Sequence, residues 1–148
     1  MEKLRTILVL RFSSIGDIIQ LTSPLHTLKD QFPNARIDII TLDEYAEILM
    51  GNPFVNRIIQ ISRNFKYKQL KEIGKKLSLY KYDLIIDLHN VIRSKIILKH
   101  ISGSKKLVYK KPRWKRFKLV QFKWNDFEDK FSQRWLYHQC LNKILINS

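Results

Sequence analysis

A short polar loop near the N-terminus holds the residue types best suited to chemistry. It contains two hydroxyl side chains, Ser13 and Ser14, followed by Gly16 and then by Asp17 where a helical pattern begins. A carboxylate placed there can accept a proton from a hydroxyl within hydrogen-bond reach, and the amides of a helix N-terminus can hold phosphate or sugar oxygens. An aspartate also caps a helix and complements its dipole. Taken alone, the loop is more typical of a cap than of a catalytic base.

The loop lacks the glycine patterns that bind nucleotides. A P-loop needs G-x-x-x-x-G-K-S/T and the dinucleotide fingerprint needs G-x-G-x-x-G, whereas Gly16 is the only glycine of this loop. The sequence therefore does not favour an ATPase or a nicotinamide-dependent enzyme.

A second polar group, HNVIRS over residues 89–94, follows a later apolar run. Arg93 presents a planar fork of donors that can bind a carboxylate or a phosphate bidentately, although a surface arginine on a helix is equally consistent. Asn90 and Ser94 are further candidate substrate ligands. His89 is more typical of a hydrogen-bonded loop residue than of a base.

An alternation of apolar runs and amphipathic segments must position both groups. Apolar, β-branched runs predict strands over residues 6–10, 36–41, 56–61, 83–88 and 106–109. Helical spacing predicts helices over about 18–32, 43–50, 67–80, 91–101 and 127–145. The order predicts an α/β fold, a Rossmann-like, doubly wound and mostly parallel sheet with helices on both faces. Ligands of such sheets bind beyond the carboxyl ends of the strands, so both polar groups are expected at one edge.

Composition excludes several classes. The chain has 148 residues, the size of one domain, and its single cysteine, Cys140, excludes an internal disulfide and a cysteine-rich metal cage. Asp83 and Asp87 flank the apolar residues 84–86 of one predicted strand, but no further metal ligands accompany them, so no metal site is expected. No apolar run approaches the roughly 20 residues of a membrane span, and the N-terminus lacks a secretory pattern. We therefore expect a cytoplasmic protein.

Positive charge is concentrated in the middle of the chain. The net charge is +15, and residues 63–123 hold 19 of the 28 Lys and Arg but only three of the 13 Asp and Glu. Such a block attracts phosphate groups of a nucleic acid, an anionic membrane or a phosphorylated glycolipid, although scattered lysines also form ordinary solvated surfaces. The densest stretch lies between residues 105 and 118, around Trp114 and Phe117, and contains Lys110, Lys111, Arg113, Lys115 and Arg116. We expect this basic strip to lie in a loop over about 110–125.

Several blocks together resemble a known family. They are ILVLRFSSIGD at 7–17, LTSP at 21–24, LKDQFP at 28–33, ARIDI at 35–39, LMGNPFVNRII at 49–59 and YDLIIDLHNVIRS at 82–94. In order and spacing they are similar to the N-terminal half of the bacterial lipopolysaccharide heptosyltransferases, glycosyltransferase family 9. Agreement over about the first 110 residues is far more specific than any single motif.

The resemblance implies one domain of a GT-B enzyme that transfers heptose from ADP-heptose to the Kdo-lipid A core of lipopolysaccharide, with inversion and without a metal or other cofactor. Asp17 then corresponds to the presumed general base, and Ser13, Ser14, Gly16, Asn90, Arg93 and Ser94 to substrate-binding positions. The basic residues 110–116 would attract the acceptor or the anionic inner face of the cytoplasmic membrane.

The same resemblance implies a second Rossmann-like domain for the ADP-sugar. We expect residues 1–148 to form the acceptor domain alone, inactive unless a separate C-terminal chain supplies the other domain. The competing interpretation is a non-enzymatic basic module that binds nucleic acid or anionic lipid through the basic strip. Under the enzyme interpretation no nucleic acid partner is expected.

Overall fold

The computed structural model describes residues 4–109 and 137–142. Its centre is a five-stranded sheet in the order β3-β2-β1-β4-β5, and every pairing is parallel. The strands are β1 (Thr6–Leu10), β2 (Arg36–Leu42), β3 (Arg57–Ile61), β4 (Leu84–Asp87) and β5 (Lys105–Val108). From β1 the chain runs outward through β2 to β3 and then returns to the other side of β1 for β4 and β5, which is the doubly wound arrangement expected from the sequence.

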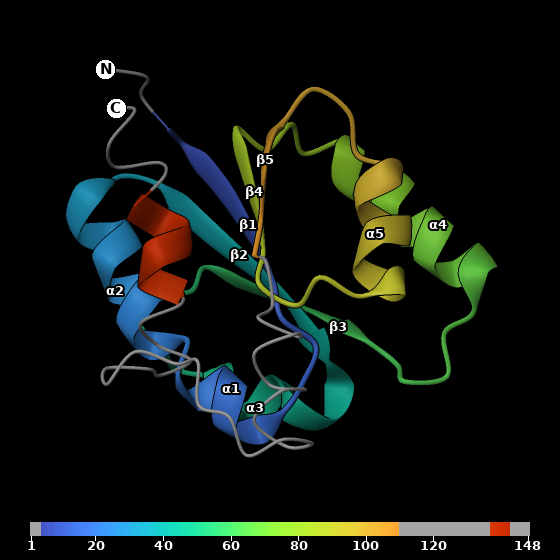
Figure 1. Cartoon of the computed structure of the whole chain (residues 1–148), viewed down its shortest axis with the longest axis horizontal. Helices are drawn as coiled ribbons and strands as arrows, with labels where there is room; N and C mark the ends of the chain where they lie inside the picture. The colour runs from blue at the N-terminus through green and yellow to red at the C-terminus, as the bar shows by residue number, and fades with distance from the viewer. Residues whose placement is uncertain (1–3, 110–136, 143–148) are drawn as a thin grey trace, which may run out of the picture.

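Helices cover both faces of the sheet. One layer contains α1 (Ile15–Ile19), α2 (Thr22–Gln31), the 3-10 turn η1 (Asp43–Tyr45), α3 (Ala46–Leu49) and a helical segment over 137–142, and the other contains α4 (Tyr67–Ser78) and α5 (Ile92–Lys99). Figure 1 shows α1, α2 and α3 on one side of the strands and α4 and α5 on the other. None of the helices in the part of the chain that the structure describes is long and apolar enough to cross a membrane.

Strand periodicity divides the core into two. Ile7 and Val9 of β1 pack under α1, α2 and the 137–142 segment, whereas Leu8 and Leu10 pack under α4 and α5. All four side chains are buried. Because successive strand side chains point to opposite faces, one continuous apolar run serves both cores.

Two predicted helices differ from the structure. The helix expected over 18–32 is divided into α1 and α2, with Gln20 and Leu21 between them. Pro24 explains the break, because it has no N–H to donate to the carbonyl of Gln20 and fits only the first turn of a new helix. The helix expected over 43–50 consists of the 3-10 turn η1 followed by the four residues of α3.

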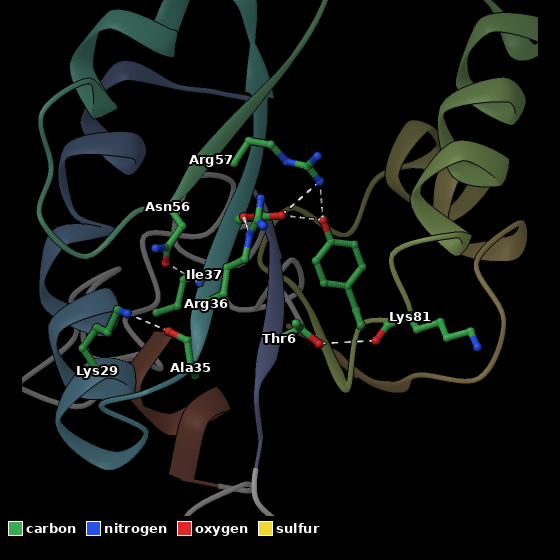
Figure 2. Close-up of polar contacts among 10 residues, drawn as sticks. Thr6, Lys29, Ala35, Arg36, Ile37, Asn56, Arg57 and Lys81 are labelled. Atoms are coloured by element: carbon green, nitrogen blue, oxygen red, sulfur yellow. Dashed lines mark hydrogen bonds and ion pairs between the residues drawn. The ribbon is translucent and has the colours of Figure 1, made fainter.

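A polar cluster joins β2, β3 and the segment before β4 near the amino ends of the strands. Oδ2 of buried Asp38 on β2 accepts a hydrogen bond from Tyr82 Oη at 2.7 Å and lies 3.0 Å from Arg57 Nη2, whereas Oδ1 accepts from Arg36 Nε at 3.0 Å. Figure 2 shows Arg57 and Arg36 reaching into this cluster from neighbouring strands. Burial and the Asp38 carboxylate raise the pKa of Tyr82, so the hydroxyl stays protonated as a donor.

Candidate active site

Asp17 is held through one of its two carboxylate oxygens. The backbone N–H of Ser14 donates to Oδ2 at 3.1 Å, the Ser14 hydroxyl donates to it at 2.9 Å, and the Arg11 guanidinium pairs with the same oxygen. Within residues 4–109 and 137–142, no hydrogen bond or ion pair engages Oδ1. The side chain is 24% exposed. Asp17 thus caps α1 and still presents one oxygen that can accept a proton.

Arg11 anchors this carboxylate to the sheet. It follows the last residue of β1 and is only 5% exposed, yet it reaches two sites. Its Nη1 donates to the carbonyl of Leu88, just beyond β4, at 2.6 Å, and its Nη2 pairs with Asp17. The buried guanidinium therefore ties the carboxyl ends of two adjacent strands to the SSIGD loop. The sequence analysis did not select Arg11, although a charged residue directly after a buried strand is a usable signal.

The surroundings of Asp17 favour its ionised form. Burial alone raises the pKa of a carboxyl group, but the Ser14 amide, the Arg11 charge and the Ser14 hydroxyl outweigh it and lower the pKa of Asp17. The carboxylate is consequently charged near neutral pH. Arg11 thus favours the ionised carboxylate and holds the Asp17 side chain in one orientation.

A buried carboxylate shapes the second polar group. Asp87, at the end of β4 and fully buried, accepts the backbone N–H groups of His89 at 2.9 Å and Asn90 at 2.8 Å through Oδ1. Its Oδ2 accepts the hydroxyl of Ser94 at 2.6 Å. Ser94 is fully buried and does not contact solvent, so its hydroxyl holds the loop in place. A substrate-binding role, which was predicted for Ser94, would require an accessible side chain.

An open cleft of about 500 Å³ lies at the carboxyl edge of the sheet. The last residue of β2 and the segments that follow β1, β3 and β4 all contribute to it. Its lining residues are Phe12, Ser13, Leu42, Arg63, His89, Asn90, Val91, Ile92, Arg93 and Lys95. Three predicted site residues, Ser13, Asn90 and Arg93, therefore share one cleft. Ser14, Gly16 and Asp17 belong to the loop that continues from Ser13, but they do not line it.

The cleft is cationic. Arg63, Arg93 and Lys95 line it, and no lining residue is acidic. Arg63 pairs with Glu44 outside the cleft and stays exposed. Burial, and then the neighbouring Arg63 charge, lower the pKa of Arg93. Arg93 and Lys95 have no carboxylate partner among the residues that line the cleft, so an anion would bind favourably beside them.

Two further lining residues are fixed by hydrogen bonds. His89 Nδ1 accepts the backbone N–H of Phe12 at 3.0 Å, which places the proton of a neutral ring on Nε2. This agrees with the expectation of a hydrogen-bonded loop residue. Arg93 Nη2 donates to the carbonyl of Ser62 at 2.6 Å, and its guanidinium lies 5.9 Å from the centre of the Phe12 ring. Phe12 thus supports both side chains.

Some predicted residues lie outside the described part of the chain. They are the basic residues Lys110, Lys111, Arg113, Lys115 and Arg116 and most of the helix expected over 127–145. Among the residues with described positions, no group of three His, Cys, Asp or Glu side chains could hold a metal ion. The roles of Asp17, Ser13, Ser14, Gly16, Asn90 and Arg93 stay predictions. Arg63 and Lys95 were missed, and the position of Arg63 just beyond β3 was the available signal.

Comparison with curated proteins finds related sequences. No family model matches the chain. Lipopolysaccharide heptosyltransferase 3 of Escherichia coli is 34% identical over 79 residues, which cover 49% of this chain and 23% of that protein. Lipopolysaccharide heptosyltransferase 1 of Pseudomonas aeruginosa is 24% identical over 107 residues, covering 64% of this chain and 29% of that protein. The chain therefore matches less than a third of the length of either relative.

Solved structures share the fold. The glycosyl transferase family 9 protein of Veillonella parvula has a TM-score of 0.72 at 19% identity, over 95% of this chain and 41% of its own. Escherichia coli heptosyltransferase WaaC with ADP has a TM-score of 0.68 at 18% identity, over 93% of this chain and 47% of its own. The sequence and structure comparisons together confirm the resemblance to the heptosyltransferase family and the Rossmann-like fold expected with it.

Proposed function

We propose that this chain is the acceptor-binding, base-carrying domain of an inverting transferase that moves heptose from ADP-heptose to the Kdo-lipid A core of lipopolysaccharide. The observation that carries the proposal is the cationic cleft at the carboxyl edge of the sheet, next to a loop whose carboxylate is charged and partly exposed. The relatives are lipopolysaccharide heptosyltransferases by name, which supports heptose as the sugar and lipopolysaccharide as the acceptor class.

The cleft suits the anionic part of the acceptor. Kdo carries a carboxylate and lipid A carries phosphates, and Arg93 can bind either group through its fork of donors. Arg63 and Lys95 add positive charge to the cleft. Ser13 and Asn90 contribute polar groups to the same lining.

Asp17 supplies the proton acceptor in this proposal. Inversion requires an acceptor hydroxyl to attack the anomeric carbon from the side opposite the departing ADP. The hydroxyl proton passes to Asp17 Oδ1 as the new C–O bond forms, while Ser14 and Arg11 hold Oδ2. The backbone N–H of Gly16 at the N-terminus of α1 orients a substrate oxygen, and the Ser14 hydroxyl oxygen accepts from a substrate hydroxyl. This reaction needs no metal or other cofactor.

The donor needs a second binding surface. In the proposed enzyme the ADP group is held chiefly by a second Rossmann-like domain, which faces the carboxyl edge described above. The ADP and ADP-2-deoxy-2-fluoro heptose complexes of WaaC, whose fold this chain shares, support a nucleotide-sugar donor.

A binding measurement tests the acceptor site without requiring transfer. Kdo-lipid A dispersed in neutral detergent is titrated into the chain and into Arg93→Gln, with Lys105→Gln as the control. Lys105 is exposed on β5 outside the cleft, so its loss removes equal charge elsewhere. We expect Arg93→Gln to weaken binding about 10-fold or more and Lys105→Gln to change it less than about twofold. Equal weakening in both variants would contradict the site.

A further inference from the structure

Among the helices that the structure describes, the two layers carry charges of opposite sign. Helices α4 and α5 together hold seven Lys and Arg and one Glu, whereas α1, α2, η1 and α3 hold five Asp and Glu and one Lys. The sheet lies between these layers (Figure 1). Helices α4 and α5 hold seven of the 19 Lys and Arg between residues 63 and 123. A face with this excess of positive charge is attracted to an anionic surface.

The exposed side of α4 is lysine-rich and ends in a leucine. Positions 68, 72, 75 and 79 follow helical spacing and lie on one side, where all four are exposed. They are Lys68, Glu72, Lys75 and Leu79, and Glu72 pairs with Lys75 at 3.5 Å. The opposite side of α4 carries the buried residues Leu70, Gly74 and Leu77, which face α5 and the sheet.

Apolar side chains interrupt this charged face. Leu79 is 81% exposed, and Tyr67 at the other end of α4 is 55% exposed. Ile92, the first residue of α5, is 77% exposed and also lines the cleft. Lysines around projecting aliphatic and aromatic side chains suit the headgroup region of a bilayer, where the ammonium groups meet phosphates and the apolar groups enter the acyl boundary.

We propose that this surface docks on an anionic phospholipid bilayer. We define the α4/α5 face by its exposed side chains Lys68, Lys75, Lys76, Leu79, Lys95 and Lys99. Lys95 belongs both to this face and to the cleft, so docking brings the mouth of the cleft to the membrane surface. The biological purpose rests on the proposed function, because a lipid-anchored acceptor is presented at such a surface. The docking itself is tested without any acceptor.

Sedimentation with vesicles measures this docking. The full chain is mixed with vesicles of phosphatidylcholine alone or with added phosphatidylglycerol, at low and high salt. We expect binding only to vesicles that contain phosphatidylglycerol, with loss at high salt. The variant Lys68→Gln/Lys75→Gln/Lys76→Gln is expected to bind about 100-fold more weakly, since each lysine contributes about fivefold.

A control on the opposite layer separates the face from the net charge. The variant Asp30→Asn/Asp43→Asn/Glu47→Gln raises the net charge by the same three units on α2, η1 and α3. At physiological salt, screening over about 8 Å isolates that layer from the membrane, so we expect less than about threefold stronger binding. Wild-type affinity of the lysine variant, or a change in the control as large as that in the lysine variant, would overturn the proposal.

Leu79→Ser distinguishes lipid from nucleic acid. Because nucleic acid offers no acyl boundary, only lipid docking predicts that this variant loses affinity, by about 10-fold. Unchanged vesicle binding by Leu79→Ser, together with displacement of the chain by duplex DNA at equal phosphate concentration, would assign the face to nucleic acid and overturn the proposal. Absence of vesicle binding alongside tight Kdo-lipid A binding would overturn only the docking and leave the proposed function intact.

Discussion

At the scale of single residues, the Asp17 carboxylate binds all of its partners among the described residues through one of its two oxygens. Oδ2 accepts the Ser14 amide, the Ser14 hydroxyl and the Arg11 guanidinium, which satisfies the start of α1 and fixes the side chain. Oδ1 stays available to a substrate hydroxyl. The cap and the base, which were alternatives in the sequence, are thus compatible in the structure.

The lowered pKa of Asp17 predicts a dependence of stability on pH. Because the pKa is lower in the folded chain than in the unfolded chain, the ionised carboxylate stabilises the fold above about pH 4, and this contribution disappears as the pH falls through the folded pKa. Asp17→Asn should therefore lower the free energy of unfolding by about 1–2 kcal/mol at neutral pH and by much less at about pH 3. Urea unfolding at both pH values measures the difference.

Arg11→Gln provides the matching variant for that pH dependence. Removing the guanidinium charge takes away one of the causes that lower the pKa of Asp17. A carbon-13 NMR titration of the carboxyl group should show a higher pKa in Arg11→Gln than in the wild type. An unchanged pKa would mean that Arg11 does not control this carboxylate.

At the scale of the elements, a glycine sets the distance between α4 and α5. A Cβ added at Gly74 would lie 2.6 Å from the carbonyl oxygen of Ile97 and 2.8 Å from the Cβ of His100. Neither the Ile97 carbonyl nor the His100 Cβ atom can move aside as the end of a flexible side chain can. The helix that carries the lysine face therefore packs closely on the helix that carries Arg93.

Gly74→Ala is expected to destabilise the fold by about 1–3 kcal/mol, because α4 must move away from α5. Gly16→Ala is the control, since a Cβ at Gly16 meets no atom within 4 Å and an alanine suits a helix better than a glycine. Thermal unfolding compares the two. Similar melting temperatures for both variants would contradict the close packing.

The strands were predictable from the sequence, and the first helix was not. Each predicted strand agrees with the structure to within about two residues, because a continuous β-branched run can be buried on both faces only within a parallel sheet. The division at Gln20 was missed because apolar spacing continues from Ile18 across it, while the missing N–H of Pro24 acts on hydrogen bonding and leaves that spacing intact.

The candidate site was predictable in part. The two polar groups lie at one edge of the sheet as expected, since the parallel pairing brings the ends of β1 and β4 together. The buried position of Ser94 was not visible, because its hydroxyl serves Asp87 seven residues earlier through a loop of irregular shape. Arg63 was missed because it lies far along the chain from residues 89–94 and meets them only through the order of the strands.

At the scale of the whole molecule, the segment over 137–142 completes the core on the side of the sheet that α1 and α2 cover. Tyr137, Cys140 and Leu141 are buried with residues of β1, β4 and α2. His138 Nε2 lies 2.8 Å from the hydroxyl of Ser23 on α2. The Tyr137 ring also lies 5.7 Å from the Arg11 guanidinium, so this segment supports the group that fixes Asp17.

Leu141→Ala should lower the free energy of unfolding by about 2–4 kcal/mol, because it leaves a cavity between the segment and the sheet. Gln139 lies on the exposed side of the same segment. Gln139→Ala should therefore change the free energy of unfolding by less than about 0.5 kcal/mol. Urea unfolding of both variants makes the comparison. Equal effects would show that residues 137–142 do not belong to the core.

Heptose transfer with Asp17→Asn tests the central claim most directly. The chain is combined with a separately expressed donor-binding domain of a similar heptosyltransferase, ADP-heptose and Kdo-lipid A, and product is quantified by mass spectrometry. The account predicts that the wild type transfers the sugar and that Asp17→Asn is slower by about 100-fold or more, with acceptor affinity unchanged within about twofold. Full activity of Asp17→Asn, or no transfer by the wild type in this mixture, would contradict Asp17 as the proton acceptor.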